Sequence, residues 1–165
     1  MLPKKSNFKI LTNNRMIILN ILIGLFVIGI TVTIQAFATG IWIRRLLAQM
    51  EDIEFSNFRL HTARLLISTS VFLIFIHLVQ ASIWAVLYML APGIVELNNF
   101  EEAMYFSLVT FTTLGYGDIT ISSVNRILSG LEAINGIILI GWSTAFMFSI
   151  YQQMIRRLHQ LGKKY

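Results

Sequence analysis

Cysteine is absent from the 165-residue sequence, and charged residues are scarce. Without cysteine the chain can form neither a disulfide bond nor a thiolate metal site. Aspartate, glutamate, lysine and arginine together supply 13% of the residues, which is half of the roughly 25% that is usual in globular domains. We therefore expect the chain to fold in lipid rather than in water.

Residues that could support catalysis are also few. The three histidines, His61, His77 and His159, lie far apart in the sequence. No nucleophile–base set and no metal-ligand spacing accompanies them. The sequence therefore predicts no enzyme activity and no cofactor.

Apolar residues make up 56% of the sequence and gather in three long segments, 16–43, 65–91 and 124–151. Segments of this length and composition are typical of membrane-spanning helices. The fold class predicted from them is an all-α membrane protein. Three polar stretches border the spans: a basic tail at 1–15, a charged connector at 44–64 and a second basic tail at 152–165.

The first apolar segment has two interpretations. A basic start, an apolar middle and the small residues Ala36 and Ala38 resemble a secretory signal peptide. The segment is longer than the apolar core of a usual signal peptide, which favours an uncleaved helix.

The connector 44–64 also has two interpretations. Apolar residues recur in and beside it at helical spacing, at Trp42, Leu46, Leu47, Met50 and Ile53. This pattern is typical of an amphipathic helix at the membrane surface. A short extension of the neighbouring spans explains it equally well.

A shorter helix is predicted between the second and third spans. Asn98 or Asn99 can cap its start, and Glu102 follows Asn99 at the spacing of a capping box. The helix would cover residues 100–111, which is too short to cross a bilayer. We expect a re-entrant element, since non-helical backbone at membrane depth must be surrounded by protein or water.

The residues after this helix are Thr112-Thr113-Leu114-Gly115-Tyr116-Gly117-Asp118. Two glycines flanking one tyrosine allow successive carbonyls to point the same way. The run Thr113 to Gly117 resembles the filter signature of the pore-loop potassium channel superfamily, and more narrowly its small bacterial members. The resemblance covers about residues 65–151. It implies an outer helix at 65–91, a pore helix and filter at 98–118 and an inner helix at 124–151.

The resemblance also implies roles for the loop residues. The carbonyl groups of four filter residues, with the Thr113 hydroxyl, would coordinate dehydrated K⁺ as the permeant ion. These residues are Thr113, Leu114, Gly115 and Tyr116. Thr112, Gly117 and Asp118 would support the filter. Tyr105 lies where relatives often place an aromatic that bonds this aspartate, although an interfacial tyrosine is an equal interpretation.

Three residues inside the spans stand out. Glu132 is a carboxylate in a span, which is costly and usually functional; we predict that it supports the filter from behind, either neutral or ionised. Gly136 lies where the family carries a gating hinge, with helix packing as the alternative. His77 could sense protons, but together with Gln80 it more simply hydrogen-bonds neighbouring helices.

One pore loop supplies a quarter of a filter, so the resemblance implies a tetramer, either a homotetramer or a mixed tetramer. The net charge of +5 lies in the tails and the connector, which indicates anionic lipid headgroups as partners rather than nucleic acid. With the C-terminus cytoplasmic and the N-terminus external, eight basic residues fall inside and five outside, as the positive-inside rule favours. An inverted pore is the alternative. We expect a multi-pass protein of the inner (plasma) membrane.

The gating stimulus is not indicated. No span carries an arginine at every third residue, which argues against voltage sensing. We expect no nucleotide- or calcium-binding domain after the third span. Gates could lie in the filter or near Phe148, Tyr151 and Met154. Two other functions stay open: a non-conducting modulatory subunit and a non-selective cation channel.

Overall fold

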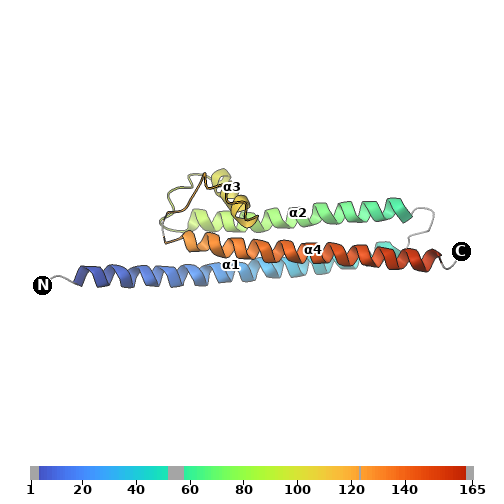
Figure 1. Cartoon of the computed structure of the whole chain (residues 1–165), viewed down its shortest axis with the longest axis horizontal. Helices are drawn as coiled ribbons and strands as arrows, with labels where there is room; N and C mark the ends of the chain where they lie inside the picture. Colours follow the sequence, from blue (N-terminus) through green and yellow to red (C-terminus); the bar gives the residue numbers. More distant parts are fainter. Residues whose placement is uncertain (1–3, 52–57, 123, 163–165) are drawn as a thin grey trace. The chain divides into compact units, whose positions relative to one another are not determined.

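The computed structural model describes residues 4–51, 58–122 and 124–162, and the side chains of residues 13–49, 58–122 and 124–160. The described residues form four helices and no strand (Figure 1). They are α1 (Lys4–Glu51), α2 (Phe58–Leu90), α3 (Phe100–Phe111) and α4 (Arg126–Gly162).

Three of these helices are long and apolar enough to cross a membrane. The candidate spans are Asn13–Gln49, Phe58–Leu90 and Arg126–Gln160. Since about 20 apolar residues suffice for a span, each helix extends beyond the apolar segment on which it is built. The prediction of an all-α membrane protein is confirmed.

The connector predicted at 44–64 forms no separate helix in its described part. Residues 44–51 continue α1, and residues 58–64 are the first turns of α2. In their described part, the connector residues therefore continue the neighbouring helices. Met50 and Ile53 of the predicted apolar stripe lie outside the described side chains.

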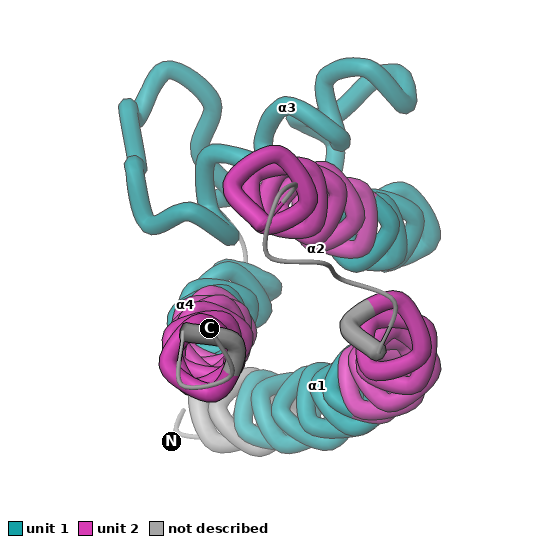
Figure 2. The backbone as a smooth tube through the Cα atoms, turned by 90° about the vertical axis from the view of Figure 1, so that its right-hand side faces the viewer, with its two compact units in different colours: residues 1–32, 79–138 teal, residues 33–78, 139–165 magenta. Residues whose placement is uncertain are grey.

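The chain divides into two compact units, and each long helix contributes to both (Figure 2). Unit 1 consists of residues 1–32 and 79–138, and unit 2 of residues 33–78 and 139–165. Unit 1 holds the predicted pore helix and filter.

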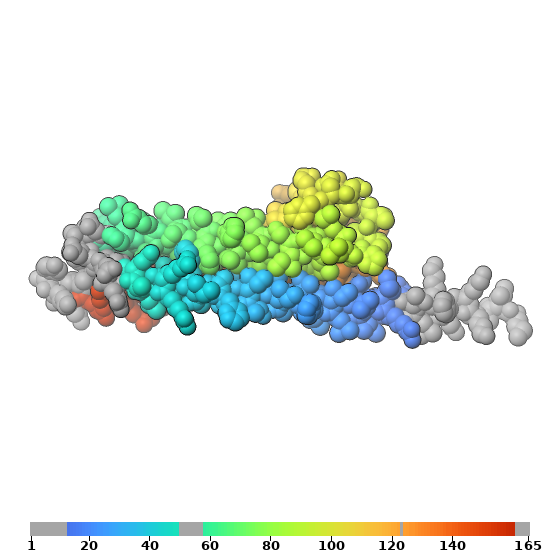
Figure 3. All heavy atoms as spheres, turned by 180° about the vertical axis from the view of Figure 1, so that it is seen from behind, coloured from blue at the N-terminus to red at the C-terminus, as the bar shows by residue number. Residues whose placement is uncertain are grey.

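The core of unit 1 is built around two buried aromatic residues of α2, Trp84 and Tyr88. Phe106 of α3 meets the Tyr88 ring edge-on at a centroid distance of 5.1 Å. Val27 of α1 and Leu128 of α4 are buried in the same hydrophobic cluster. Figure 3 shows α3 (yellow) resting on the last turns of α2 (yellow-green). The short helix is therefore fixed by packing against the spans.

Unit 2 has its own smaller core. Leu46, Phe58, Leu65, Ile150 and Met154 are buried together. Beside them, Trp42 stacks on Phe72 at 4.1 Å, and its indole N–H donates to Thr69 Oγ1 at 3.0 Å. Met154 is a core residue of this unit, whereas Phe148 and Tyr151 are exposed. The three residues named as a gate therefore do not share one surface.

Candidate functional site

The start of α3 is capped by the asparagines that precede it. The Asn99 side chain accepts a hydrogen bond from the backbone N–H of Glu102 at 2.9 Å. In return, the Glu102 carboxylate accepts one from the backbone N–H of Asn98 at 2.8 Å. This reciprocal pair resembles a capping box displaced by one residue. It fixes α3 at Phe100–Phe111, the residues that the sequence predicts.

The end of α3 leads directly into the loop. Thr112 is the C-cap, and its hydroxyl donates to the Leu108 carbonyl at 2.7 Å. The backbone N–H groups of Leu114 and Gly115 both donate to the Val109 carbonyl, at 2.9 and 3.3 Å. The first loop residues are therefore tied to the last turn of the helix. The support role of Thr112 stays a prediction.

The loop backbone alternates in the sign of φ. Thr113 has a φ of 60°, Gly115 of 56° and Gly117 of 79°, while Leu114 and Tyr116 have negative φ. Among the described residues, Thr113 is the one non-glycine with positive φ, a conformation that is rare for a β-branched side chain. In such an alternating segment the N–H groups gather on one side, so the carbonyl oxygens can gather on the other.

The loop is exposed along its length. Residues 112–118 are all exposed in the single chain, including the large apolar side chains of Leu114 (57%) and Tyr116 (67%). No second segment of the described chain covers them. The loop surface is therefore open to solvent in the single chain.

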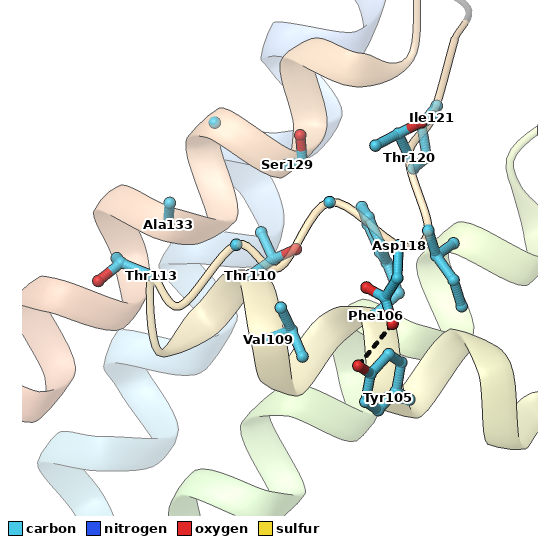
Figure 4. Close-up of a pocket in the computed structure, with 14 residues that line it drawn as sticks. Tyr105, Phe106, Val109, Thr110, Thr113, Asp118, Thr120, Ile121, Ser129 and Ala133 are labelled. Atoms are coloured by element: carbon cyan, nitrogen blue, oxygen red, sulfur yellow. Dashed lines mark hydrogen bonds between the residues drawn. The ribbon is translucent and has the colours of Figure 1, made fainter.

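The loop, α3 and α4 enclose a pocket of about 430 Å³ (Figure 4). Thr113 and Asp118 line it from the loop, and Ser129 and Ala133 line it from α4. Figure 4 shows the Tyr105 hydroxyl of α3 pointing at the Asp118 carboxylate. The two oxygens are 2.7 Å apart. The structure thus contains the hydrogen bond that the sequence predicts between these residues.

This hydrogen bond changes the acidity of both partners. The Tyr105 hydroxyl lowers the pKa of Asp118, with bonds from the backbone N–H groups of Asp118 and Ile119 adding to the effect. The bond to Asp118 in turn raises the pKa of Tyr105. Asp118 is therefore held as the carboxylate, and the phenol keeps its proton.

Glu132 of α4 is fully buried. The Tyr88 hydroxyl donates to its Oε2 atom at 2.5 Å, and Ser107 Oγ lies 2.5 Å from its Oε1 atom. The same Ser107 Oγ lies 2.7 Å from the Ala81 carbonyl oxygen. The predicted contact between Glu132 and the pore helix is present. Tyr88 and Ser107 were not predicted, and a hydroxyl at membrane depth was the one signal for each.

Gly136 lies where α4 touches the end of α3. A Cβ atom on this residue would overlap the carbonyl oxygen of Phe111. Such an approach needs glycine, and the contact corresponds to the packing interpretation. A hinge at Gly136 stays a prediction.

The polar residues on the helices pair with one another. In unit 1, Asn135 donates to Thr31 Oγ1 at 2.9 Å and does not share the partners of Glu132. Gln80 donates to the Thr31 carbonyl at 3.3 Å. In unit 2, His77 Nε2 lies 3.0 Å from Ser143 Oγ. His77 and Gln80 thus follow the hydrogen-bonding interpretation.

Comparison with known proteins decides the family. A sequence profile described as ion channel matches residues 65–153, more than half of the chain. The chain belongs to the ion channel family. The matched region begins in α2, includes α3 and the loop, and ends in α4. The channel is therefore a multi-pass membrane protein.

One curated relative of the channel is the calcium-gated potassium channel TvoK of Thermoplasma volcanium. The two sequences are 35% identical over 71 residues. The match covers 42% of this channel and 20% of the relative, so the chain spans a fifth of that protein. No solved structure matches the channel.

Proposed function

We propose that the protein is a potassium-selective channel that conducts K⁺ passively through a filter built by four copies of the loop. The peptide oxygens of Thr113, Leu114, Gly115 and Tyr116, with the Thr113 hydroxyl, replace the hydration shell of the ion. The observation that carries the proposal is the alternation of φ from Thr113 to Gly117. It is the backbone pattern in which carbonyl oxygens can line one side of a segment.

Two further observations support this function. The loop is exposed in the single chain, as a surface that meets three other copies must be. The relative TvoK is named as a potassium channel. Its calcium gating is not carried over, because the match covers a fifth of that protein and the described residues hold no cluster of three metal-binding side chains.

The proposal gives each supporting residue a role. The Tyr105–Asp118 bond and the tied residues Thr112 to Gly115 hold the loop in its alternating conformation. The C-terminal end of α3 carries a partial negative charge, which favours a cation where the helix points. No side chain performs chemistry, so the channel needs no cofactor.

The placement in the membrane is part of the proposal. The C-terminus is cytoplasmic and the N-terminus external, in the plasma membrane, with anionic lipid headgroups beside the basic tails. The sequence has no cysteine, so a single cysteine introduced in either tail can be labelled selectively. A membrane-impermeant thiol reagent should label an N-terminal cysteine from outside and a C-terminal cysteine from inside. The reverse pattern would support the inverted pore.

Ion flux into liposomes that contain the purified protein tests the function. We expect K⁺ uptake and little Na⁺ uptake. Gly115→Ala should abolish K⁺ uptake, because alanine is strained at a φ of 56°. Gly40→Ala is the matched control, since its added Cβ meets nothing within 4 Å. Equal K⁺ and Na⁺ flux would indicate a non-selective channel, and no flux a modulatory subunit.

A further inference from the structure

The cluster around Glu132 contains too few hydroxyl protons for an ionised carboxylate. Three short oxygen–oxygen contacts form a row: Tyr88 Oη to Glu132 Oε2, Glu132 Oε1 to Ser107 Oγ, and Ser107 Oγ to the Ala81 carbonyl. Each contact is a hydrogen bond only if one proton lies between its two oxygens. The row therefore needs three protons.

Only two of those protons come from hydroxyl groups. Tyr88 has one, and its bond to Oε2 uses it. Ser107 has one, and a carbonyl oxygen can only accept, so the Ala81 contact takes the Ser107 proton. The remaining contact, 2.5 Å between Glu132 Oε1 and Ser107 Oγ, must be bridged by a proton from Glu132.

We infer that Glu132 is the neutral carboxylic acid and donates to Ser107. It forms the middle link of a directional row of hydrogen bonds from Tyr88 through Glu132 and Ser107 to the Ala81 carbonyl. This row of hydrogen bonds joins α2, α3 and α4 within unit 1, and ionisation of Glu132 breaks it. The inference concerns the protonation of one residue and holds whether or not the ion is K⁺.

The surroundings of Glu132 agree with a neutral group. Burial of a carboxylate at membrane depth requires a partner charge. Among the described residues, the hydrogen-bond partners of Glu132 are Tyr88 and Ser107, and neither carries a charge. Among the described side chains, the titratable groups on the packed elements of unit 1 are engaged or exposed. On α3, Tyr105 binds Asp118, Glu102 binds Asn98 and Glu101 is exposed. Arg126 of α4 and Arg15 of α1 are exposed.

The alternative protonation states each leave a contact without a proton. In an ionised Glu132 that accepts from both hydroxyl groups, the Ser107 and Ala81 oxygens stand 2.7 Å apart with nothing between them. If Glu132 is protonated on Oε2, no proton lies between its Oε1 atom and Ser107 Oγ, although they are 2.5 Å apart. The neutral acid with its proton on Oε1 satisfies all three.

Infrared spectroscopy of the purified protein in lipid at neutral pH tests the protonation directly. We expect the C=O stretching band of a protonated carboxylic acid, shifted by exchange into D₂O, in the wild type. Glu132→Gln should remove the band. Glu96→Gln is the matched control and should keep it, because Glu96 is an exposed carboxylate bound by Ser122. No acid band, or a band that Glu132→Gln leaves in place, overturns the inference.

The stabilising role of this row of hydrogen bonds has a separate test. A glutamine amide has one acceptor and one donor group, so Glu132→Gln reproduces the neutral acid without being able to ionise. Wild-type thermal stability and ion flux should fall as alkaline pH removes the acid band, and those of Glu132→Gln should not. If both proteins lose stability equally with pH, the row of hydrogen bonds is not the cause of the pH dependence. If the protein conducts no ion, the infrared band and the thermal stability still test whether Glu132 is the neutral acid.

Discussion

Thr113 shows most clearly how the loop differs from ordinary backbone. A positive φ is unfavourable for a β-branched residue, and conformations of this kind cost about 1–3 kcal/mol and persist where the surroundings hold them. The bonds that hold this residue are visible: its own N–H donates to Thr110, and the next two N–H groups donate to Val109. The resemblance in sequence suggested the residue type, but not which residues carry the positive φ.

Tyr105→Phe removes one atom and one hydrogen bond. We expect faster inactivation of the current and a less stable tetramer, because Asp118 loses the hydroxyl that holds it. The Asp118 pKa, which is lowered chiefly by this bond, should rise toward its ordinary value. In the wild type, the stabilising effect of the bond is present above the ordinary pKa of aspartate and is lost as pH falls through the lowered pKa of Asp118. In the variant, the acid-sensitive range of Asp118 should therefore lie at higher pH.

Single-channel recordings at several pH values and gel analysis of the tetramer provide the measurement. Ser68→Ala is the control, since it also removes a hydroxyl, one that bonds the Leu65 carbonyl of its own helix. Currents and tetramer stability that do not change in Tyr105→Phe would remove Tyr105 from the filter support.

Glu96 gives a second pH dependence at the residue scale. The Ser122 hydroxyl and backbone N–H both donate to its carboxylate, at 2.5 and 3.0 Å, and lower its pKa to about 2 from 4.5. A lowered pKa means that the link is fully present above pH 4.5 and is lost as pH falls toward about 2. Ser122→Ala removes the largest cause, so the Glu96 pKa should rise.

An NMR titration of the Glu96 carboxyl carbon measures this change. Ser129→Ala, which loses a hydroxyl bonded to the carbonyl of its own helix, should leave the titration in place. An identical Glu96 curve in the wild type and Ser122→Ala would contradict the assignment.

At the scale of elements, the contact between α3 and α4 depends on Gly136. Gly136→Ala should destabilise the protein by about 1–3 kcal/mol, the usual cost of inserting atoms into a packed contact, because the new Cβ would overlap the Phe111 carbonyl. Thermal unfolding in detergent measures the effect. Gly141→Ala on the same helix adds a Cβ that meets nothing within 4 Å, and its stability should change by less than about 0.5 kcal/mol. Equal stability of the two variants would argue against a close contact at Gly136.

The first helix is held to α4 and to the residue before it by polar contacts. In unit 1, Thr31 pairs with Asn135, and Asn20 donates to Asn125 at 2.8 Å. Thr31→Val keeps the shape and removes the hydroxyl. We expect the free energy of unfolding to fall by about 0.6 kcal/mol and by no more than about 1.7 kcal/mol, the average and the maximum for hydrogen bonds between membrane helices. Thr144→Val is the control, because Thr144 is exposed and bonds its own helix. A Thr31→Val protein as stable as this control would show that the pairing adds nothing.

The elements themselves were the most predictable feature. Long apolar segments give the three spans, and the cap at Asn99 gives the start of α3. The ends of the spans were harder to predict, since α1 and α4 continue past the apolar residues into charged ones. Hydropathy describes the solvent around a helix and does not report where the helical hydrogen bonds stop.

The contacts of the site were less predictable than its residues. The Tyr105–Asp118 bond followed from the resemblance to a family. The partners of Glu132 did not, because Tyr88 is 44 residues away in the sequence and only the packing of α2 against α4 brings it close. Asn135 lies three residues after Glu132 on the same helix, yet it binds Thr31 of α1. Spacing along one helix does not reveal which neighbour each residue meets.

At the scale of the whole molecule, the proposed filter requires more than one chain. A single loop offers one row of carbonyl groups, and its residues are exposed. Closed symmetry is the common solution when a chain carries one part of a site. Four loops around one axis would cover the exposed Leu114 and Tyr116 side chains and place the four rows of oxygens opposite one another.

The most direct test of the central claim is an electron cryomicroscopy structure of the purified protein in potassium. We expect a tetramer, with the carbonyl oxygens of Thr113 to Tyr116 from four chains facing a common axis and ion density between them. A monomeric particle, or loops whose oxygens face away from any shared axis, would contradict it.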